Sequence, residues 1–530
     1  MTTKMLDNGF PLHRVAERSE GDPSVSPTAL SRRFVALLMA VTVIALTINV
    51  LTLTTFPAIH TDEAWYANLA RNWLTTGNRW TTLDIGPFPD GRGQGTTLLG
   101  AVPTRLAIQA WGLSLQAIRL PSLFAGLALL GVVAGIGRPL WPGRIGPLAA
   151  LVLLTQPLFL LGSHMARPEI WLALVVLLAL GCSVLGWKRN QPLWDVAAAL
   201  LAVLSVEIHQ NGAVFAVGLA ASYLARYGRT VLRQPGSLAF LGVSLLGALA
   251  YLYRHPGWLL PVQGGGNANA LLGTHSSHSV PLLSSNPVEW VLNELVRYLL
   301  YFGNEPLGAL LFGLAIAAAL RRRGTADRLL LAWWLGSAVA MMLLVSHMLE
   351  TYLLPMLSVG ALLVGRGMAE LVRQEEPWGR QVVALTFGVL SLPLLLTLGE
   401  SGANQTAQLQ RELQQSVPCQ RILGPNQYWL AFTDCDYRSW DVVSHYHHLH
   451  GMSFDESMTA IRPDYLLIDS TIVEKLREDL DVGGRTGSYY ALPRADFQRF
   501  LDHQTTLIRW LALPDQGTIQ IRRVHWEGRP

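Results

Sequence analysis

The chain has 530 residues, of which 51% are hydrophobic and 14% are charged, and its formal net charge is +4. So few charges are not enough for the surface of a soluble globular protein of this length, and the composition excludes that class in favour of a membrane protein. The small basic excess is expected to reflect loops on one side of a membrane, and it gives no reason to expect nucleic-acid binding.

The first part of the chain predicts a tail followed by a membrane anchor. Residues 1–32 are mostly polar and contain Pro and Gly, and a long apolar run begins after Arg32 and Arg33. That run is longer than the apolar region of a secretory signal peptide and contains no small-residue cleavage motif. We therefore expect a cytoplasmic N-terminal tail and a first helix that stays in the membrane.

Residues 33–399 contain a series of apolar segments near the length of roughly 20 residues that crosses a bilayer. They predict an α-helical polytopic membrane domain with about eleven transmembrane helices. The expected spans are residues 34–56, 115–137, 146–163, 168–187, 192–207, 213–227, 238–253, 307–320, 328–346, 352–364 and 382–398.

Every second connector between these spans is basic. The basic connectors contain Arg32 and Arg33; Arg138 and Arg144; Lys188 and Arg189; Arg226, Arg229 and Arg233; Arg321, Arg322, Arg323 and Arg328; and Arg366, Arg373 and Arg380. Because Lys and Arg collect in cytoplasmic loops, this pattern predicts an inner-membrane protein with a cytoplasmic N-terminus. The other connectors then lie outside, among them the first loop (57–114), a long loop (254–306) and the C-terminal region (400–530).

Two adjacent carboxylates, Asp62 and Glu63, stand near the start of the first outer loop, within a turn or two of the bilayer. One explanation is structural, since Thr61 could cap a helix whose first turn favours acidic side chains. The spacing of Trp65 and Trp73 suits such a helix, lying along the membrane interface as an anchor.

Other outer turns also carry polar side chains at the ends of spans. ARPEIW contains Arg167 and Glu169, EIHQNG contains Glu207 and His209, and HMLETYLLP contains His347, Glu350 and Tyr352. The convergence of such groups on one face indicates a functional site. Arginines on the side where basic residues are disfavoured are candidate ligands for an anionic substrate, namely Arg105, Arg119, Arg167, Arg254 and Arg297.

These segments carry a family resemblance. The acidic pair followed by AWYANLARNWLTTG, then AIRLPSLFAGLALL, ARPEIWLAL and ETYLLPMLS, resembles the membrane glycosyltransferases of the GT-C fold. Within that fold the chain is most similar to the branch that contains protein O-mannosyltransferases and the lipid A aminoarabinose transferase. The resemblance implies a sugar donor carried on a polyprenyl phosphate and transfer to an acceptor on the outer face.

The resemblance also assigns roles to residues. Asp62 matches the acidic position described as the catalytic base, and Glu63 matches its neighbour. The matches to substrate-binding positions are Arg119 in RLPS, Arg167 and Glu169 in the second acidic motif, and Tyr352 and Pro355 in the Y-x-L-P segment.

The chain also departs from the family pattern. A Lys-Pro-Pro segment late in the first loop is replaced by DGRGQGTTLL, where Arg92 offers the nearest counterpart. His209 or Gln210 stands where a Lys is common, and Glu350 stands where a basic residue is common. These departures concern the contacts to phosphate and metal more than the base.

The chemistry of such a transfer explains why these residue types are needed. A polyprenyl phosphate leaves as an anion, so its departure requires nearby positive charge more than a general acid. The acceptor hydroxyl or amine needs a carboxylate to remove its proton as it attacks an oxocarbenium-like carbon, and Asp62 suits that role. We expect single displacement with inversion at C1. The sugar, and whether the acceptor is a glycan, a lipid or a protein, stay open.

A divalent metal ion could neutralise the phosphate, with Glu63, His209 and Asp84 or Asp90 as candidate ligands, while no organic cofactor is expected. The alternative function is a transporter or flippase of a lipid-linked or polar substrate. A transporter usually places polar groups or broken helices near mid-bilayer, whereas the polar groups here lie at one face.

Residues 400–530 have the composition of a soluble domain large enough to fold by itself. RILGPNQYWLAF and PDYLLIDS are expected to form strands, and SFDESMTAI and STIVEKLRED helices, of a small external α/β domain. The histidine-rich run SHYHHLHG is expected to form a solvated loop. Cys419 and Cys435 are expected to form a disulfide, because an external domain meets an oxidising environment.

Overall fold

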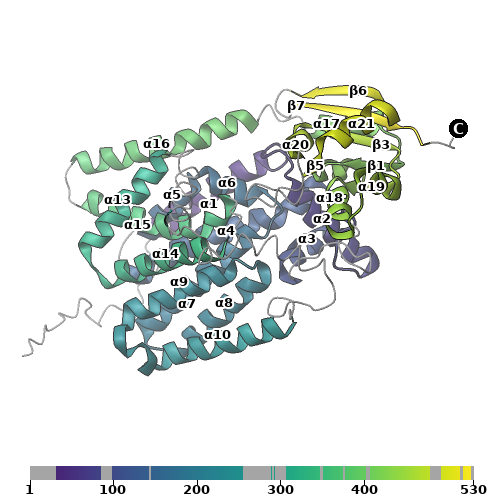
Figure 1. Cartoon of the computed structure of the whole chain (residues 1–530). Helices are drawn as coiled ribbons and strands as arrows, with labels where there is room; N and C mark the ends of the chain where they lie inside the picture. Colours follow the sequence, from purple (N-terminus) through teal and green to yellow (C-terminus); the bar gives the residue numbers. More distant parts are fainter. Residues whose placement is uncertain are drawn as a thin grey trace, which may run out of the picture.

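A computed structural model describes residues 32–84, 98–141, 145–254, 288, 292, 306–345, 350–373, 377–401, 406–477, 491–513 and 517–526. The predictions made for the N-terminal tail, for Arg92 and for nearly all of the loop 254–306 concern residues outside this described part. Figure 1 shows a bundle of long helices with an α/β domain at one end.

The bundle helices coincide with the expected spans. They are α1 (Arg32–Thr52), α4 (Leu115–Leu140), α5 (Ile145–Leu154), α6 (Pro157–His164), α7 (Glu169–Arg189), α8 (Pro192–Ile208), α9 (Gly212–Tyr227), α10 (Pro235–Arg254), α13 (Pro306–Arg322), α14 (Thr325–Leu344), α15 (Leu354–Arg373) and α16 (Pro377–Ser401), with the 3-10 turns η1 (Gly228–Arg233) and η4 (Glu350–Leu353) between them. The third expected span is a pair, since α5 and α6 meet at a bend of 74°.

Within the described residues, six helical segments are long and apolar enough to cross a membrane, or seven if the bent pair counts as one span. They comprise α4, α7, α10, α14, α16 and η4 together with α15. The chain is therefore a multi-pass membrane protein. The helices α8, α9 and α13 have only 16 or 17 residues, so the predicted total of about eleven crossings stays a prediction.

The bundle core is made by apolar side chains of α4, α5, α7, α9, α14 and α15. Small residues allow close contact where helices cross, as membrane helices commonly require. At the crossing of α4 and α5, a Cβ on Gly146 would lie 2.1 Å from the carbonyl oxygen of Ala134, so only glycine fits there.

Helices α2 (Thr61–Thr76) and α3 (Leu98–Trp111) lie at the end of the bundle that carries the α/β domain (Figure 1). One explanation of the acidic pair made Thr61 the cap of α2, but the capping residue is His60. The backbone N–H of Asp62 donates to His60 Nδ1 over 3.1 Å, and the backbone N–H of His60 donates to the Glu63 carboxylate over 3.0 Å. The helix ends where Gly77 adopts a φ of 79°. Glycine suits that left-handed conformation because it has no Cβ.

The C-terminal domain contains a five-stranded sheet in the order β2-β1-β3-β7-β6. Strands β2 (Asp436–Ser439), β1 (Arg421–Gly424) and β3 (Tyr465–Ile468) are parallel, whereas β7 (Gly517–Val524) and β6 (Thr505–Leu513) run antiparallel to their neighbours. A second pair is formed by β4 (Leu476–Arg477) and β5 (Leu492–Pro493). The remaining elements are α17 (Thr406–Ser416), η5 (Asn426–Ala431), α18 (Asp441–His450), α19 (Phe454–Ile461), α20 (Ser470–Lys475) and α21 (Arg494–Gln504).

The α/β character predicted for this region is confirmed, with local corrections. The segment RILGPNQYWLAF is a strand only in its first part, because Pro425 ends β1 and the 3-10 turn η5 follows. The helix expected over STIVEKLRED ends at Lys475, and the histidine-rich run is helix α18 instead of a loop. The predicted disulfide between Cys419 and Cys435 is present.

Candidate active site

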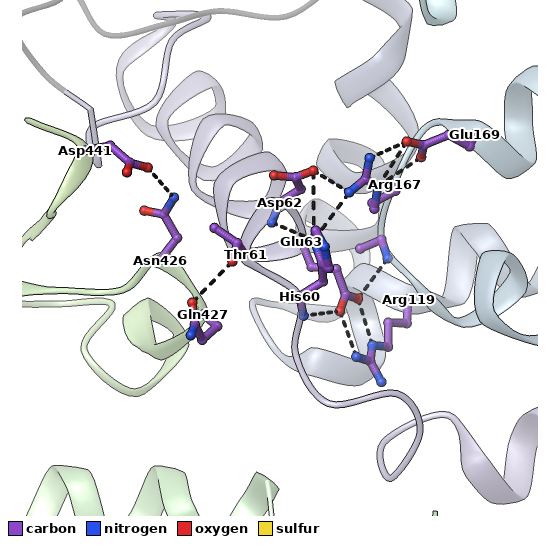
Figure 2. A network of polar contacts seen from close by, with 11 residues as sticks. His60, Thr61, Asp62, Glu63, Arg119, Arg167, Glu169, Asn426, Gln427 and Asp441 are labelled. Atoms are coloured by element: carbon purple, nitrogen blue, oxygen red, sulfur yellow. Dashed lines mark hydrogen bonds and ion pairs between the residues drawn. The ribbon is translucent and has the colours of Figure 1, made fainter. Parts of the chain in front are cut away.

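The predicted site residues gather where the first turn of α2 meets the bundle. Figure 2 shows Asp62 and Glu63 pointing to different partners, Asp62 toward Arg167 and Glu63 toward Arg119. The two carboxylates are adjacent in sequence but about 100° apart around a helix axis. They therefore enter two different networks.

The inner network joins Glu63 to Arg119 of α4. Arg119 donates from Nε and Nη2 to the two carboxylate oxygens, each over 2.8 Å, and both side chains have 0% exposure. Glu63 also accepts the backbone N–H groups of His60 over 3.0 Å and of Ala166 over 2.9 Å. Burial by itself would raise the pKa of the Glu63 carboxyl, but the Arg119 guanidinium and these hydrogen bonds outweigh it and lower the pKa.

Arg119 has no N–H left for a substrate. Its Nη1 donates to the carbonyl oxygens of Leu53 and Phe56 over 2.9 and 3.1 Å, and its Nη2 donates to that of Pro57 over 3.0 Å. With the two bonds to Glu63, all five guanidinium donors are used. These bonds give Arg119 a structural role, and its predicted contact with a substrate stays a prediction. Arg119 ties the end of α1 and the start of α2 to α4.

The surroundings of Glu63 favour a role other than the predicted one. Its oxygens accept four hydrogen bonds from groups that hold them in a fully buried position. Such a carboxylate has no free lone pair aimed at a metal ion or a substrate proton. Glu63 therefore suits a positioning role better than the predicted role in catalysis or metal binding.

The outer network joins Asp62 to Arg167 and Glu169. Arg167 lies in the short break between α6 and α7, where its backbone N–H donates to the Met165 carbonyl over 2.8 Å. Its Nη1 bonds Asp62 Oδ2, and its Nε donates to the Glu169 carboxylate oxygens over 3.0 and 3.1 Å. The Asp62 side chain is 40% exposed, against 5% for Arg167 and 2% for Glu169. Asp62 is thus the carboxylate of this network that solvent or a substrate can reach.

The two carboxylates keep Arg167 charged. Burial would lower the pKa of the Arg167 guanidinium, but Glu169 and Asp62 outweigh that effect and raise it. A guanidinium held in this way orients one oxygen of Asp62. In the described part of the chain no side chain bonds the other oxygen, Oδ1, so it can accept a proton.

His209 and Tyr352 also reach this network. Their rings lie 5.2 Å apart between centroids, and His209 Nδ1 accepts the backbone N–H of Asn211 over 3.1 Å. Burial lowers the pKa of His209, although the charge of Glu169 opposes it, so the imidazole is neutral near pH 7. The predicted grouping of Asp62, Arg167, Glu169, His209 and Tyr352 is therefore present in the fold.

The sequence reasoning missed two members of this site. His60 Nδ1 lies 3.3 Å from Arg167 Nη1, and burial lowers the pKa of His60 so that this nitrogen can accept. Tyr66 is one turn after Asp62, and burial followed by the charge of Glu169 raises the pKa of its hydroxyl. For Tyr66 the available signal was its spacing of four residues from Asp62, which places both on one helix face, whereas helical spacing gave no signal for His60, the extended residue before α2.

The metal prediction finds little support among these residues. Glu63 has no free lone pair, and Asp84 lies at the contact with the C-terminal domain, where it accepts the Trp65 indole N–H over 2.7 Å. In the described ranges no three histidine, cysteine, aspartate or glutamate side chains form a group that could hold a metal ion. Arg92 and Asp90 fall outside those ranges.

A helical membrane bundle with an α/β domain over the end that carries this site is the GT-C glycosyltransferase fold. ArnT from Cupriavidus metallidurans, in a crystal structure with bound undecaprenyl phosphate, matches with a TM-score of 0.55 at 14% identity over 94% of this chain and 100% of that one. The oligosaccharyltransferase of Archaeoglobus fulgidus in its apo form matches with a TM-score of 0.55 at 13% identity over 93% of this chain and 75% of that one. AglB from the same organism, in complex with an inhibitory peptide and a dolichol-phosphate, matches with a TM-score of 0.54 at 15% identity over 83% of this chain and 70% of that one.

Residues 98–253, from α3 to α10, match the family model of dolichyl-phosphate-mannose-protein mannosyltransferases. A search of curated protein sequences gives no match. The family match and the fold confirm the resemblance to this class of membrane glycosyltransferases. A further Archaeoglobus structure of the oligosaccharyltransferase is a complex with Zn and sulfate.

Proposed function

We propose that this protein transfers a sugar from a polyprenyl-phosphate donor to an acceptor at the outer face of the cytoplasmic membrane. The observation that carries the proposal is the pairing of one half-exposed carboxylate, Asp62, with a buried guanidinium, Arg167, at the membrane end of the C-terminal domain. A lipid-linked donor suits this position, since its tail stays in the bilayer while its head group reaches the site.

Asp62 is the proposed general base. Its Oδ2 is fixed by Arg167, and Oδ1 is left to accept the proton of the acceptor hydroxyl or amine as that group attacks C1. The phosphate leaves from the opposite face of the sugar, so the product has inverted anomeric configuration. Retention of configuration in the isolated product would reject this displacement.

The donor phosphate needs more positive charge than this cluster supplies. Asp62, Glu63 and Glu169 face two arginines, and with both histidines neutral the cluster is negative by one charge. Tyr352 and His209 can contribute hydrogen bonds. We propose that cations of the loops 57–114 and 254–306, with Arg92 first among them, or a divalent ion complete the phosphate site.

The proposed orientation rests on two independent features. Arg119 and Glu169 of the site lie near the starts of α4 and α7, whereas the basic residues Arg138, Lys188 and Arg189 lie in their last turns, at the opposite ends, as the positive-inside pattern requires for an external site. The disulfide between Cys419 and Cys435 suits an oxidising compartment. We therefore place the site and the C-terminal domain outside the cytoplasm, with about eleven membrane crossings in all.

Sugar transfer by purified protein tests the function. Wild type in nanodiscs is offered radiolabelled polyprenyl-phosphate sugars with membrane extract as acceptor, beside Asp62→Asn and the matched control Asp502→Asn, an exposed carboxylate far from the site. We expect label transfer by wild type and the control, and a loss of about 10²- to 10⁴-fold in Asp62→Asn. Absence of transfer from every lipid-linked sugar by folded wild type would contradict the function, and an active Asp62→Asn would contradict the base.

A further inference from the structure

Helix α2 is packed into the core of the C-terminal domain. Ala64, Ala67 and Ala70 are fully buried and recur every three residues, which places them on one helix face. They belong to an apolar cluster whose other members come largely from the C-terminal domain, including Leu413, Ile422, Tyr428, Trp429 and Phe432. Methyl side chains let the domain approach the helix closely, so the helix that carries Asp62 follows the position of that domain.

A chain of hydrogen bonds connects the C-terminal domain to the residue before Asp62. The hydroxyl of Thr61 donates to Gln427 Oε1 over 3.3 Å, and Gln427 Nε2 donates to Asp469 Oδ2 over 2.9 Å (Figure 2 shows the first of these bonds). Asp469 is itself fixed by the Tyr428 hydroxyl over 2.8 Å and by the backbone N–H of Thr471 over 3.0 Å.

The chemistry of these groups fixes the orientation of the Gln427 amide. A carboxylate can only accept, so the NH₂ group of Gln427 must face Asp469 and the amide oxygen must face Thr61. The Thr61 hydroxyl then has a donor role toward Gln427. The bond is directional, and it acts on the first residue of α2, immediately before the proposed base.

Two more attachments hold α2 to the same domain. Arg71, in the middle of the helix, bonds the Thr433 carbonyl and donates to Asp434 over 2.8 Å. Beyond the helix, the backbone N–H of Ser439 donates to the Leu83 carbonyl over 3.0 Å. The C-terminal domain thus contacts α2 from Thr61 to Arg71, while α3 packs against another part of the helix and the membrane bundle holds its first turn through Glu63 and Asp62.

We propose that the C-terminal domain is a positioning element for the base, and that Gln427 sets the first turn of α2 through Thr61 so that Asp62 aligns with Arg167. Gln427 and Thr61 are positioning residues, since neither needs to touch the reacting atoms. The expected effect on the transfer rate rests on the proposed function. Misplacing a reacting group by about 1 Å can lower a rate by about 100-fold, so a modest rotation of this turn is enough to matter.

Thr61→Val tests this bond, because it removes the hydroxyl while keeping the shape of the side chain. Thr61→Ser restores the donor, and Thr75→Val is the matched control, since the exposed Thr75 hydroxyl bonds only to backbone carbonyls within α2. We expect kcat to fall about five- to tenfold in Thr61→Val with the donor KM unchanged, and to recover to within about twofold in Thr61→Ser. Wild-type kcat in Thr61→Val, or a loss that Thr61→Ser does not restore, would overturn the proposal.

Gln427→Leu tests the same bond from the C-terminal domain. We expect it to lower kcat as Thr61→Val does, and the double variant to be no slower than either single variant, because both remove one interaction. Hydrogen exchange measures docking without any substrate, and the backbone amides of residues 62–66 should exchange faster in both variants than in Thr75→Val. Additive losses of kcat, or unchanged exchange, would overturn the proposal. If wild type transfers no sugar, the proposed function fails, and the exchange result still decides whether Gln427 holds α2.

Discussion

The two arginine-carboxylate networks at the start of α2 differ in access, although their carboxylates are neighbours in sequence. Glu63 and Arg119 both have 0% exposure, and every donor of that arginine is used inside the protein. In the other network Asp62 is 40% exposed, while Arg167 and Glu169 behind it are buried. The closed network holds helices α1, α2 and α4 together, whereas the open network leaves one carboxylate accessible from outside.

The largest expected effect comes from breaking the closed network. Arg119→Met leaves Glu63 buried without its cation, which typically costs about 3 to 5 kcal/mol. We expect a large loss of thermal stability in detergent for this variant. The double variant Glu63→Gln/Arg119→Met should recover part of it, but not all, because the carbonyls of Leu53, Phe56 and Pro57 lose their donors in both cases. Equal stability of Arg119→Met and wild type would contradict the structural role.

The open network should respond in rate more than in stability. Arg167→Lys keeps a positive charge but cannot hold Glu169 and Asp62 with one planar group. We expect kcat for transfer to fall about 10- to 100-fold, and the loss of stability to be smaller than in Arg119→Met because Lys keeps a positive charge beside Glu169. Arg499→Lys, an exposed arginine paired with Asp455, is the control. A rate equal to that of the control would show that the fork of Arg167 does not orient the base.

A third carboxylate, Asp84, differs from both because it is buried and the cation nearest to it, Lys475, is paired with Asp441. It accepts the Trp65 indole N–H and faces Asp441 of α18, Lys475 of α20 and the Ser439 hydroxyl. Burial, followed by the charge of Asp441, raises the pKa of Asp84 to about 7 from the ordinary value of 3.8. The folded protein therefore binds more protons than the unfolded chain between about pH 4 and 7, and its stability falls as the pH rises through this window.

Thermal unfolding as a function of pH measures this effect. We expect the free energy of unfolding of wild type to fall by up to about 1.4 kcal/mol per pH unit from this group as the pH rises from 4 toward 7. Asp84→Asn keeps an acceptor for the Trp65 indole N–H but cannot bind a proton in this range. The free energy of unfolding of this variant should therefore fall less steeply with pH. Equal slopes for the two proteins would contradict the raised pKa.

The smallest effect is expected at an exposed ion pair. Arg499 and Asp455 are 2.7 Å apart, but their side chains are 54% and 51% exposed. Solvent screens such a pair, and we expect Arg499→Ala to change the free energy of unfolding by less than about 1 kcal/mol. If Arg499→Ala lowered the free energy of unfolding as much as Arg119→Met does, burial would not explain why the Glu63–Arg119 pair matters more for stability.

Much of this site could be predicted from the sequence, because alternating membrane spans bring every second turn to the same face. That rule alone placed Asp62, Arg167, Glu169, His209 and Tyr352 together. It could not separate Asp62 from Glu63, since both are first-turn carboxylates with the same local signal. Their roles differ because the rotation of α2 is set by contacts remote in sequence, with Arg119 on one side and the C-terminal domain on the other.

The fold of the C-terminal domain was predictable to the same limited extent. The apolar run of β3 is buried on both faces and predicts a strand by itself. The segment after β1 also looked like a strand, but it makes a 3-10 turn whose Tyr428 and Trp429 pack beside α2. Since that contact joins residues more than 350 positions apart, no local pattern in the sequence could show it.

Asp62→Asn and Glu63→Gln, measured side by side for single-turnover sugar transfer and for thermal unfolding, test the central claim most directly. We predict that Asp62→Asn loses about 10²- to 10⁴-fold in rate with near wild-type stability, and that Glu63→Gln loses mainly stability. A stable Glu63→Gln protein with no transfer, beside an Asp62→Asn protein with normal transfer, would contradict the assignment of the open carboxylate to chemistry and the closed one to structure.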